Sequence, residues 1–211
     1  MIVQNKKTLL IILSGIVGII FIWSLINPKD YFVWFLEVVP AIIGIALLAF
    51  TYKRFPFTNI IYVFVALHAI VLIVGGHYTY AENPLFDWFK EIFSLDRNHY
   101  DRLGHFVQGF FPALIIREFL LRKTKLERGK MLFFIVVSIA LAISASYEIM
   151  EWWSALGVDP AAGTAFLGTQ GDIWDAQWDM FLALIGASLS QLLFSGMHDR
   201  QLKALLQKRK R

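Results

Sequence analysis

Apolar residues along the chain fall into six long stretches separated by short polar connections. A helix needs about 20 residues to cross a hydrocarbon layer roughly 30 Å thick. Within lipid each backbone amide must be satisfied inside its own segment, so continuous apolar runs of this length are helices. They are too long and too uniformly apolar for the alternating strands of a membrane barrel. We predict an all-α polytopic membrane bundle of about six spans in a single domain over residues 1–211, with spans at residues 8–26, 31–50, 60–80, 103–121, 131–153 and 177–194.

Composition agrees with this class. Hydrophobic residues make up 57% of the chain and charged residues only 17%, whereas soluble domains carry about a quarter charged residues. The chain has no cysteine, which excludes disulfides, thiolate metal ligands and cysteine nucleophiles. The first stretch resembles a signal peptide, but it is longer than a usual apolar core and no small-residue cleavage site follows, so we expect an uncleaved first span.

Lysine and arginine are distributed unevenly between the two sides of the predicted bundle. Because these residues stay on the cytoplasmic side, the basic segments at 6–7, 122–130 and 200–211 place both termini in the cytoplasm. No lysine or arginine lies between Met131 and Asp199, so the loop joining the last two spans is expected outside. The tryptophans fall near the predicted outer ends of spans, as in an aromatic belt. The net charge of +4 is explained by this topology, and no nucleic-acid partner is predicted.

Polar residues gather at the predicted outer ends of the last three spans, where charged groups are costly and are candidates for function. In the fourth span, Asp101, His105 and Gln108 are spaced by four and three residues and share one helix face. A helix N-terminus alone would explain Asp101. It would not explain why His105 and Gln108 continue inward on the same face.

The fifth span carries Tyr147, Glu148 and Glu151 near its C-terminal end. Acids at this end of a helix oppose its dipole, and two acids on one face repel each other. We expect a cation, a shared proton or hydrogen-bond donors to offset the repulsion.

The last span begins with Asp172, Asp175 and Asp179, which share one face through spacings of three and four. Helix capping explains Asp172 well and Asp179 poorly, because Asp179 lies two turns into the helix among apolar residues. His77, at the outer end of the third span, is a further residue that could join these acids.

If these helix ends converge, carboxylates with one imidazole form a site suited to magnesium, manganese, iron or zinc. A carboxylate cluster that shares protons, or plain solvated helix ends, would account for the same pattern. The candidate catalytic residues are Glu148, Glu151 and Asp101, the candidate metal ligands are His105, Asp175, Asp179 and Asp172, and the further polar candidates are His77, Gln108 and Tyr147.

The chain resembles the YjdF family of bacterial inner-membrane proteins over nearly its whole length. The most distinctive motifs of the resemblance lie at residues 77–80, 98–105, 147–152 and 171–179. The resemblance implies a multi-pass protein of the bacterial cytoplasmic (inner) membrane and no particular activity. The acids of the last three spans are also similar to the pattern of VanZ-like membrane proteins, which points toward envelope lipids or cell-wall precursors.

Three functions remain open. The first is a metal-assisted hydrolase or transferase acting on an envelope lipid or wall intermediate, and the second is a cation- or proton-coupled transporter. The third is a non-catalytic membrane protein, such as an envelope-stress factor, whose polar network holds the bundle together. The sequence contains no phosphate-binding glycine loop, no nucleophile elbow and no His-Glu-x-x-His helix. It leaves the oligomeric state open.

Overall fold

The computed structural model describes residues 6–157, 167 and 169–209, and every regular element in this part of the chain is helical. This confirms the all-α class. Residues 210 and 211, the end of the basic tail, lie outside the described residues. The elements are α1 (Lys6–Ser24), α2 (Tyr31–Thr51), α3 (Asn59–Tyr78), the short 3-10 helix η1 (Tyr80–Glu82), α4 (Pro84–Phe93), α5 (Tyr100–Lys123), α6 (Lys130–Leu156) and α8 (Asp175–Arg209).

Five helices are long and apolar enough to cross a membrane, namely α1, α2, α3, α6 and α8. The protein is therefore a multi-pass membrane protein. The fourth predicted span forms α5, which has 24 residues, but polar residues such as His105, Gln108 and Arg117 lower its hydropathy. Six crossings remain a prediction. Helix α8, with 35 residues, continues well beyond the predicted end of the last span.

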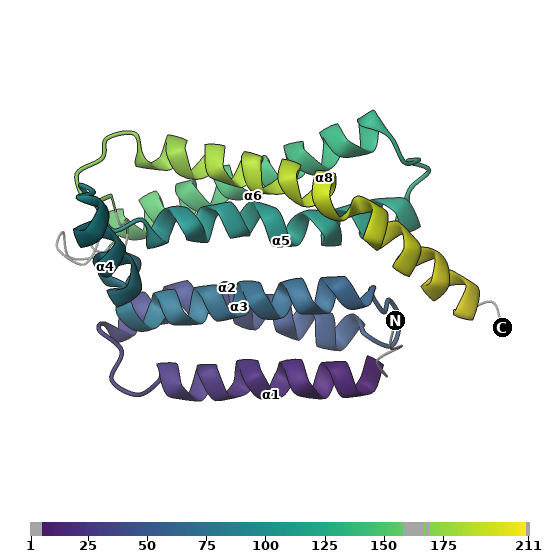
Figure 1. The fold of residues 1–211 in the computed structure, drawn as a ribbon, viewed down its shortest axis with the longest axis horizontal. Helices are drawn as coiled ribbons and strands as arrows, with labels where there is room; N and C mark the ends of the chain where they lie inside the picture. Colours follow the sequence, from purple (N-terminus) through teal and green to yellow (C-terminus); the bar gives the residue numbers. More distant parts are fainter. Residues whose placement is uncertain (1–5, 158–166, 168, 210–211) are drawn as a thin grey trace.

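The long helices lie side by side along one direction, with α1 at one edge and α6 and α8 at the other (Figure 1). Helix α4 lies across one end of this bundle, which we call the site end. The start of α1 and the last turns of α8 lie together at the opposite end, which we call the far end (Figure 1). The segment that follows α3 and η1 forms α4, and the Asn83 side chain caps this helix by accepting from the backbone N–H groups of Leu85 and Phe86.

Helices α5 and α8 approach closely because glycines face the partner backbone at two points. A Cβ atom at Gly109 would overlap the backbone of Ala183, and one at Gly186 would overlap the carbonyl oxygen of Phe106. Small residues allow such close packing between membrane helices. The contact brings the polar start of α5 beside the polar start of α8.

A second polar network ties the helices together at the far end. Glu118 and His198 are fully buried there. Arg117 donates to Nδ1 of His198 at 2.6 Å, so Nε2 of that ring carries the hydrogen and donates to Glu118 at 3.0 Å. Glu118 also accepts from the Thr58 hydroxyl at 2.8 Å and from Arg122 at 2.6 Å. These bonds fasten α5 to α8 and to the start of α3.

Candidate metal and proton site

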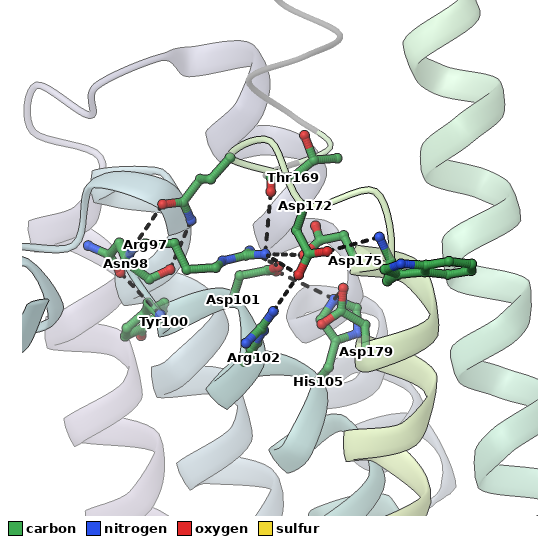
Figure 2. A network of polar contacts seen from close by, with 12 residues as sticks. Arg97, Asn98, Tyr100, Asp101, Arg102, His105, Thr169, Asp172, Asp175 and Asp179 are labelled. Atoms are coloured by element: carbon green, nitrogen blue, oxygen red, sulfur yellow. Dashed lines mark hydrogen bonds and ion pairs between the residues drawn. The ribbon is translucent and has the colours of Figure 1, made fainter. Parts of the chain in front are cut away.

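Three buried side chains from α5 and α8 meet near the site end: Asp101, His105 and Asp179. One potential ligand atom of each lies within 4.8 Å of the others. Nε2 of His105 is 3.5 Å from Oδ1 of Asp101 and 4.0 Å from Oδ2 of Asp179 (Figure 2). Asp179 is only 2% exposed. The spacing of four residues puts Asp101 and His105 on one face of α5, as predicted, and the close contact with α8 adds Asp179.

The opposite edge of the His105 ring faces a different set of groups. Its Nδ1 atom is 3.2 Å from Oε1 of Gln108 and 3.4 Å from Oε1 of Glu148, which belongs to α6. The ring of Tyr147 lies edge-on to the imidazole, with centroids 6.2 Å apart. A hydrogen on Nδ1 that points to Gln108 or Glu148 leaves the lone pair of Nε2 facing the two aspartates. In that tautomer the aspartates and the imidazole need a shared proton or a cation between them.

Several carboxylate oxygens in this region are buried without a hydrogen-bond partner among the described residues. They are Oδ1 of Asp179, Oε1 of Glu148 and Oε2 of Glu37. A buried polar atom without a partner costs free energy, and a buried carboxylate costs more. A cation or a proton shared between these groups would satisfy such atoms.

Glu37 is a residue that the sequence reasoning missed. It is the only acidic or basic residue within α2 and is 1% exposed. Its hydrogen-bond partner is Tyr80 of η1, whose ring packs where Gly75 leaves room for it. The Tyr80 hydroxyl donates this hydrogen bond to the Glu37 carboxyl group. A lone carboxylate inside an apolar span was the signal that could have identified it.

Two arginines from the segment around the start of α5 engage the acids nearest the end of the bundle. Arg97, 6% exposed, forms an ion pair with Asp175 and lies 3.4 Å from Asp101. Arg102 donates to Asp172 at 2.6 Å (Figure 2). Asp172 and Asp175, both expected as metal ligands, therefore face guanidinium groups.

Other polar groups complete this arginine layer. Arg97 also donates to the carbonyl oxygen of Thr169 at 3.3 Å. Asp172 also accepts from the backbone N–H of Trp174, in the turn that precedes α8. Burial, with the positive charges of Arg102 and Arg97, lowers the pKa of His99 below its ordinary value. The layer is thus a rim in which the guanidinium groups of Arg97 and Arg102 are paired with the carboxylates of Asp175 and Asp172.

The remaining predicted residues divide between the cluster and its surroundings. Glu151 is buried one turn beyond Glu148 on α6. His77 lies apart from the cluster, with its Nδ1 atom 3.1 Å from the carbonyl oxygen of Ser24 and its ring packed at a tilt against Trp23. The structure brings together the acids of three helices around His105, and His77 belongs to a separate contact with α1.

A cavity of about 160 Å³ adjoins the cluster and extends between α2, α3, α5 and α6. Asp101, His105 and Gln108 line its polar side, and His68, Leu72 and Ile143 line the rest of it together with Pro40 and Pro112. Nε2 of His68 has no hydrogen-bond partner among the described residues. The cavity therefore connects the acidic cluster with a second histidine in the apolar part of the bundle.

Comparison with known proteins identifies relatives of the whole chain. A family model described as "Predicted membrane protein (DUF2238)" matches residues 9–200. The "Inner membrane protein YjdF" of Escherichia coli (strain K12) is 48% identical over 185 residues, which cover 88% of this chain and 88% of that protein. The predicted resemblance to the YjdF family is thereby confirmed. No solved structure matches the chain.

Proposed function

The chain belongs to the DUF2238 family of predicted membrane proteins, and we propose that it is an inner-membrane enzyme in which a divalent metal ion assists hydrolysis or group transfer on an envelope lipid or a lipid-linked wall intermediate. The observation that carries this proposal is the buried Asp101–His105–Asp179 cluster. The name of the E. coli relative supports the inner membrane as its location.

The ligand atoms of Asp101, His105 and Asp179 are more typical of a catalytic than of a structural metal site. Two carboxylates and one imidazole supply three ligands, and catalytic sites keep further positions for water or substrate. Oxygen-rich sites with one imidazole suit manganese, magnesium, iron or zinc. Such an ion lowers the pKa of bound water or polarises a phosphoryl or carbonyl oxygen. The free Oδ1 atom of Asp179 supports this reading, because it is buried and unpartnered among the described residues.

The residues around the metal ligands would position His105, act as a general base and bind the substrate. Glu148 would hold the His105 ring through Nδ1, as a carboxylate commonly does for a metal-bound histidine. Glu151, buried on the same helix as Glu148, is our candidate for a general base. Asp172 and Asp175 would hold Arg102 and Arg97, whose guanidinium groups at the rim suit a phosphate-bearing headgroup.

A lipid substrate is supported by the position of the cavity. Its walls come from helices that are long and apolar enough to span a bilayer, together with α5. Leu72 and Ile143 line it beside the polar cluster, and Ile143 is exposed on the outer surface of the bundle. A molecule with an apolar tail and a polar reacting group would match both surfaces.

The site is proposed to face the periplasm, with both termini in the cytoplasm. Basic residues at the far end of the bundle, including Lys6, Lys53 and Lys203, support this orientation under the positive-inside rule. The common position of the start of α1 and the end of α8 agrees with it (Figure 1).

The test is a lipid conversion assay with purified protein reconstituted into vesicles of total bacterial envelope lipid. Mass spectrometry would compare lipid classes after incubation with manganese or zinc. The proposal predicts that the wild type changes the abundance of a lipid class, and that EDTA or Asp179→Asn abolishes the change. Asp96→Asn, an exposed aspartate at the same end, should retain it. Identical lipid profiles for the wild type and Asp179→Asn would contradict an enzymatic role.

A cation- or proton-coupled transporter is a second candidate, supported by the cavity that joins His105 to His68. Buried histidines and carboxylates in sequence can pass protons across a membrane. This function predicts that vesicles containing the wild-type protein take up manganese, or protons along a pH gradient. The uptake should be lost in Asp179→Asn and retained in Asp96→Asn. Absence of uptake by the wild type would exclude it.

A further inference from the structure

Helix α1 is held less tightly than the other spans. Along its 19 residues only Ser24 is buried. It packs on α3, and its contact with α2 is much weaker than the contact that either helix makes with α3. Between the three helices lies a cavity of about 600 Å³, which we call the α1 groove.

The walls of the α1 groove are almost entirely hydrocarbon. Helix α1 contributes Leu13, Val17 and Phe21, while α2 and α3 contribute aliphatic residues such as Ile45 and Val65. Among the residues that the structure describes, the polar side chains in its lining are those of Ser14, Tyr52 and Tyr62. Such a surface offers no charge or hydrogen-bond pattern for a polar ligand and fits an apolar occupant.

The length of the groove matches one leaflet of a bilayer. Its α1 wall runs from Leu10 to Phe21, about 16 Å at 1.5 Å per residue. That is about half of a hydrocarbon core roughly 30 Å thick. One acyl chain of a phospholipid also extends over one leaflet, so a single hydrocarbon chain matches the length and the apolar lining of the groove.

Basic groups mark the end of the groove that lies at the far end of the bundle. Tyr52 and Tyr62 close this end. Nζ of Lys6 lies 4.7 Å from the centre of the Tyr62 ring and donates to the carbonyl oxygen of Phe57. Lys53, one residue after Tyr52, is exposed. An anionic headgroup at this end would meet positive charge while its tail followed the apolar walls.

We propose that the α1 groove binds one acyl chain of an anionic phospholipid from the leaflet at the far end of the bundle. The bound chain fills the space between α1 and α2 and so fixes α1 on the rest of the protein. This site is separate from the Asp101–His105–Asp179 cluster and does not depend on the proposed enzymatic activity.

Two glycines on α1 provide a matched pair of variants. A Cβ atom at either Gly15 or Gly18 has no neighbour within 4 Å, so both positions have space for a larger side chain. Only Gly18 lines the groove. Gly18→Phe therefore fills the groove, and Gly15→Phe adds the same ring on α1 outside it.

Native mass spectrometry of the full chain in detergent with added phosphatidylglycerol tests the proposal. The wild type and Gly15→Phe should each retain one phosphatidylglycerol per chain under conditions that remove other lipids, and Gly18→Phe should lose it. Phosphatidylcholine should be retained less than phosphatidylglycerol. Equal retention of phosphatidylglycerol by Gly18→Phe and the wild type would overturn the site. Equal retention of the two lipids would overturn the anionic preference.

A photoreactive group in the acyl chain of phosphatidylglycerol gives a second measurement that does not rely on a variant. Cross-links in the wild type should map to residues 10–21 of α1 and 41–52 of α2. Cross-links spread evenly over the outer helices would show annular lipid only and overturn the proposal. A wild-type dimer that Gly18→Phe converts to monomer, without loss of lipid, would assign the groove to a second copy and overturn it as well.

Discussion

Nδ1 of His105 lies 3.4 Å from Oε1 of Glu148, on the edge of the ring opposite to Asp101 and Asp179. The contact links α5 to α6, so acids from α6 and α8 hold one imidazole from two sides. A carboxylate on the second ring nitrogen orients a metal-ligating histidine and raises its basicity. Glu148 is therefore a positioning residue in this account.

The contact predicts how Glu148→Gln will behave. The amide oxygen can still accept from Nδ1–H, but the negative charge is lost, so the affinity for manganese or zinc should fall about 10- to 100-fold. Isothermal titration of the metal into purified protein measures this change. Glu91→Gln, at an exposed position of α4, should bind like the wild type. Unchanged affinity in Glu148→Gln would remove Glu148 from any role in orienting His105.

Arg97 joins the acidic starts of α5 and α8 and should matter for stability. Arg97→Ala leaves Asp175 and Asp101 buried without their guanidinium partner, which typically costs about 3–5 kcal/mol. Lys29→Ala breaks an ion pair with Glu82 in which both side chains are more than half exposed, so it should cost at most about 1 kcal/mol. Unfolding in mixed detergent micelles gives both values. Equal effects of the two substitutions would contradict the buried network.

Gly109 sets the distance between α5 and α8. Gly109→Ala places a methyl group against the backbone of Ala183 and should destabilise the protein by about 1–3 kcal/mol, as overpacking does. Separation of the helices should also weaken metal binding. Gly44→Ala meets open space and should be neutral or stabilising by up to about 1 kcal/mol through helix propensity. A Gly109→Ala protein with wild-type melting temperature and metal affinity would show that this close contact does not build the site.

The absence of cysteine makes the orientation easy to test with single introduced thiols. Ser94, after α4 at the site end, and Lys125, between α5 and α6, are both exposed. In intact cells a membrane-impermeant maleimide should label Ser94→Cys and not Lys125→Cys, and lysis should make both reactive. Labelling of Lys125→Cys alone in intact cells would reverse the proposed topology.

The helices and the α5 part of the site, Asp101 and His105, could be predicted from the sequence because both depend on local patterns. Apolar runs of membrane length determine helices locally, and a spacing of four residues fixes Asp101 and His105 on one face. Which side chain Asp175 and Asp179 each contact depends on how α8 packs against α5 and the segment before it. Arg97, in the segment before α5, meets Asp175, while His105, within α5, faces Asp179 one turn deeper in α8.

Two residues show where the local pattern was insufficient. Glu37 lies in an otherwise apolar span, and its relation to the site appears only when Tyr80 of η1 packs against α3 beside it. His77 has the right depth for the cluster but contacts Ser24, because α1 lies beside α3 at that level. Helix neighbours, which the spacing of residues along one chain does not determine, decide both outcomes.

The most direct test is an equilibrium titration of manganese and zinc into metal-free purified protein. The account predicts saturable binding of a single ion per chain in the wild type and in Asp96→Asn, with loss of binding in Asp179→Asn and in Asp101→Asn. Affinity should weaken as the pH becomes acidic, because the ligands must be deprotonated to bind. Absence of saturable binding in the wild type, or binding by Asp179→Asn equal to the wild type, would contradict the metal site.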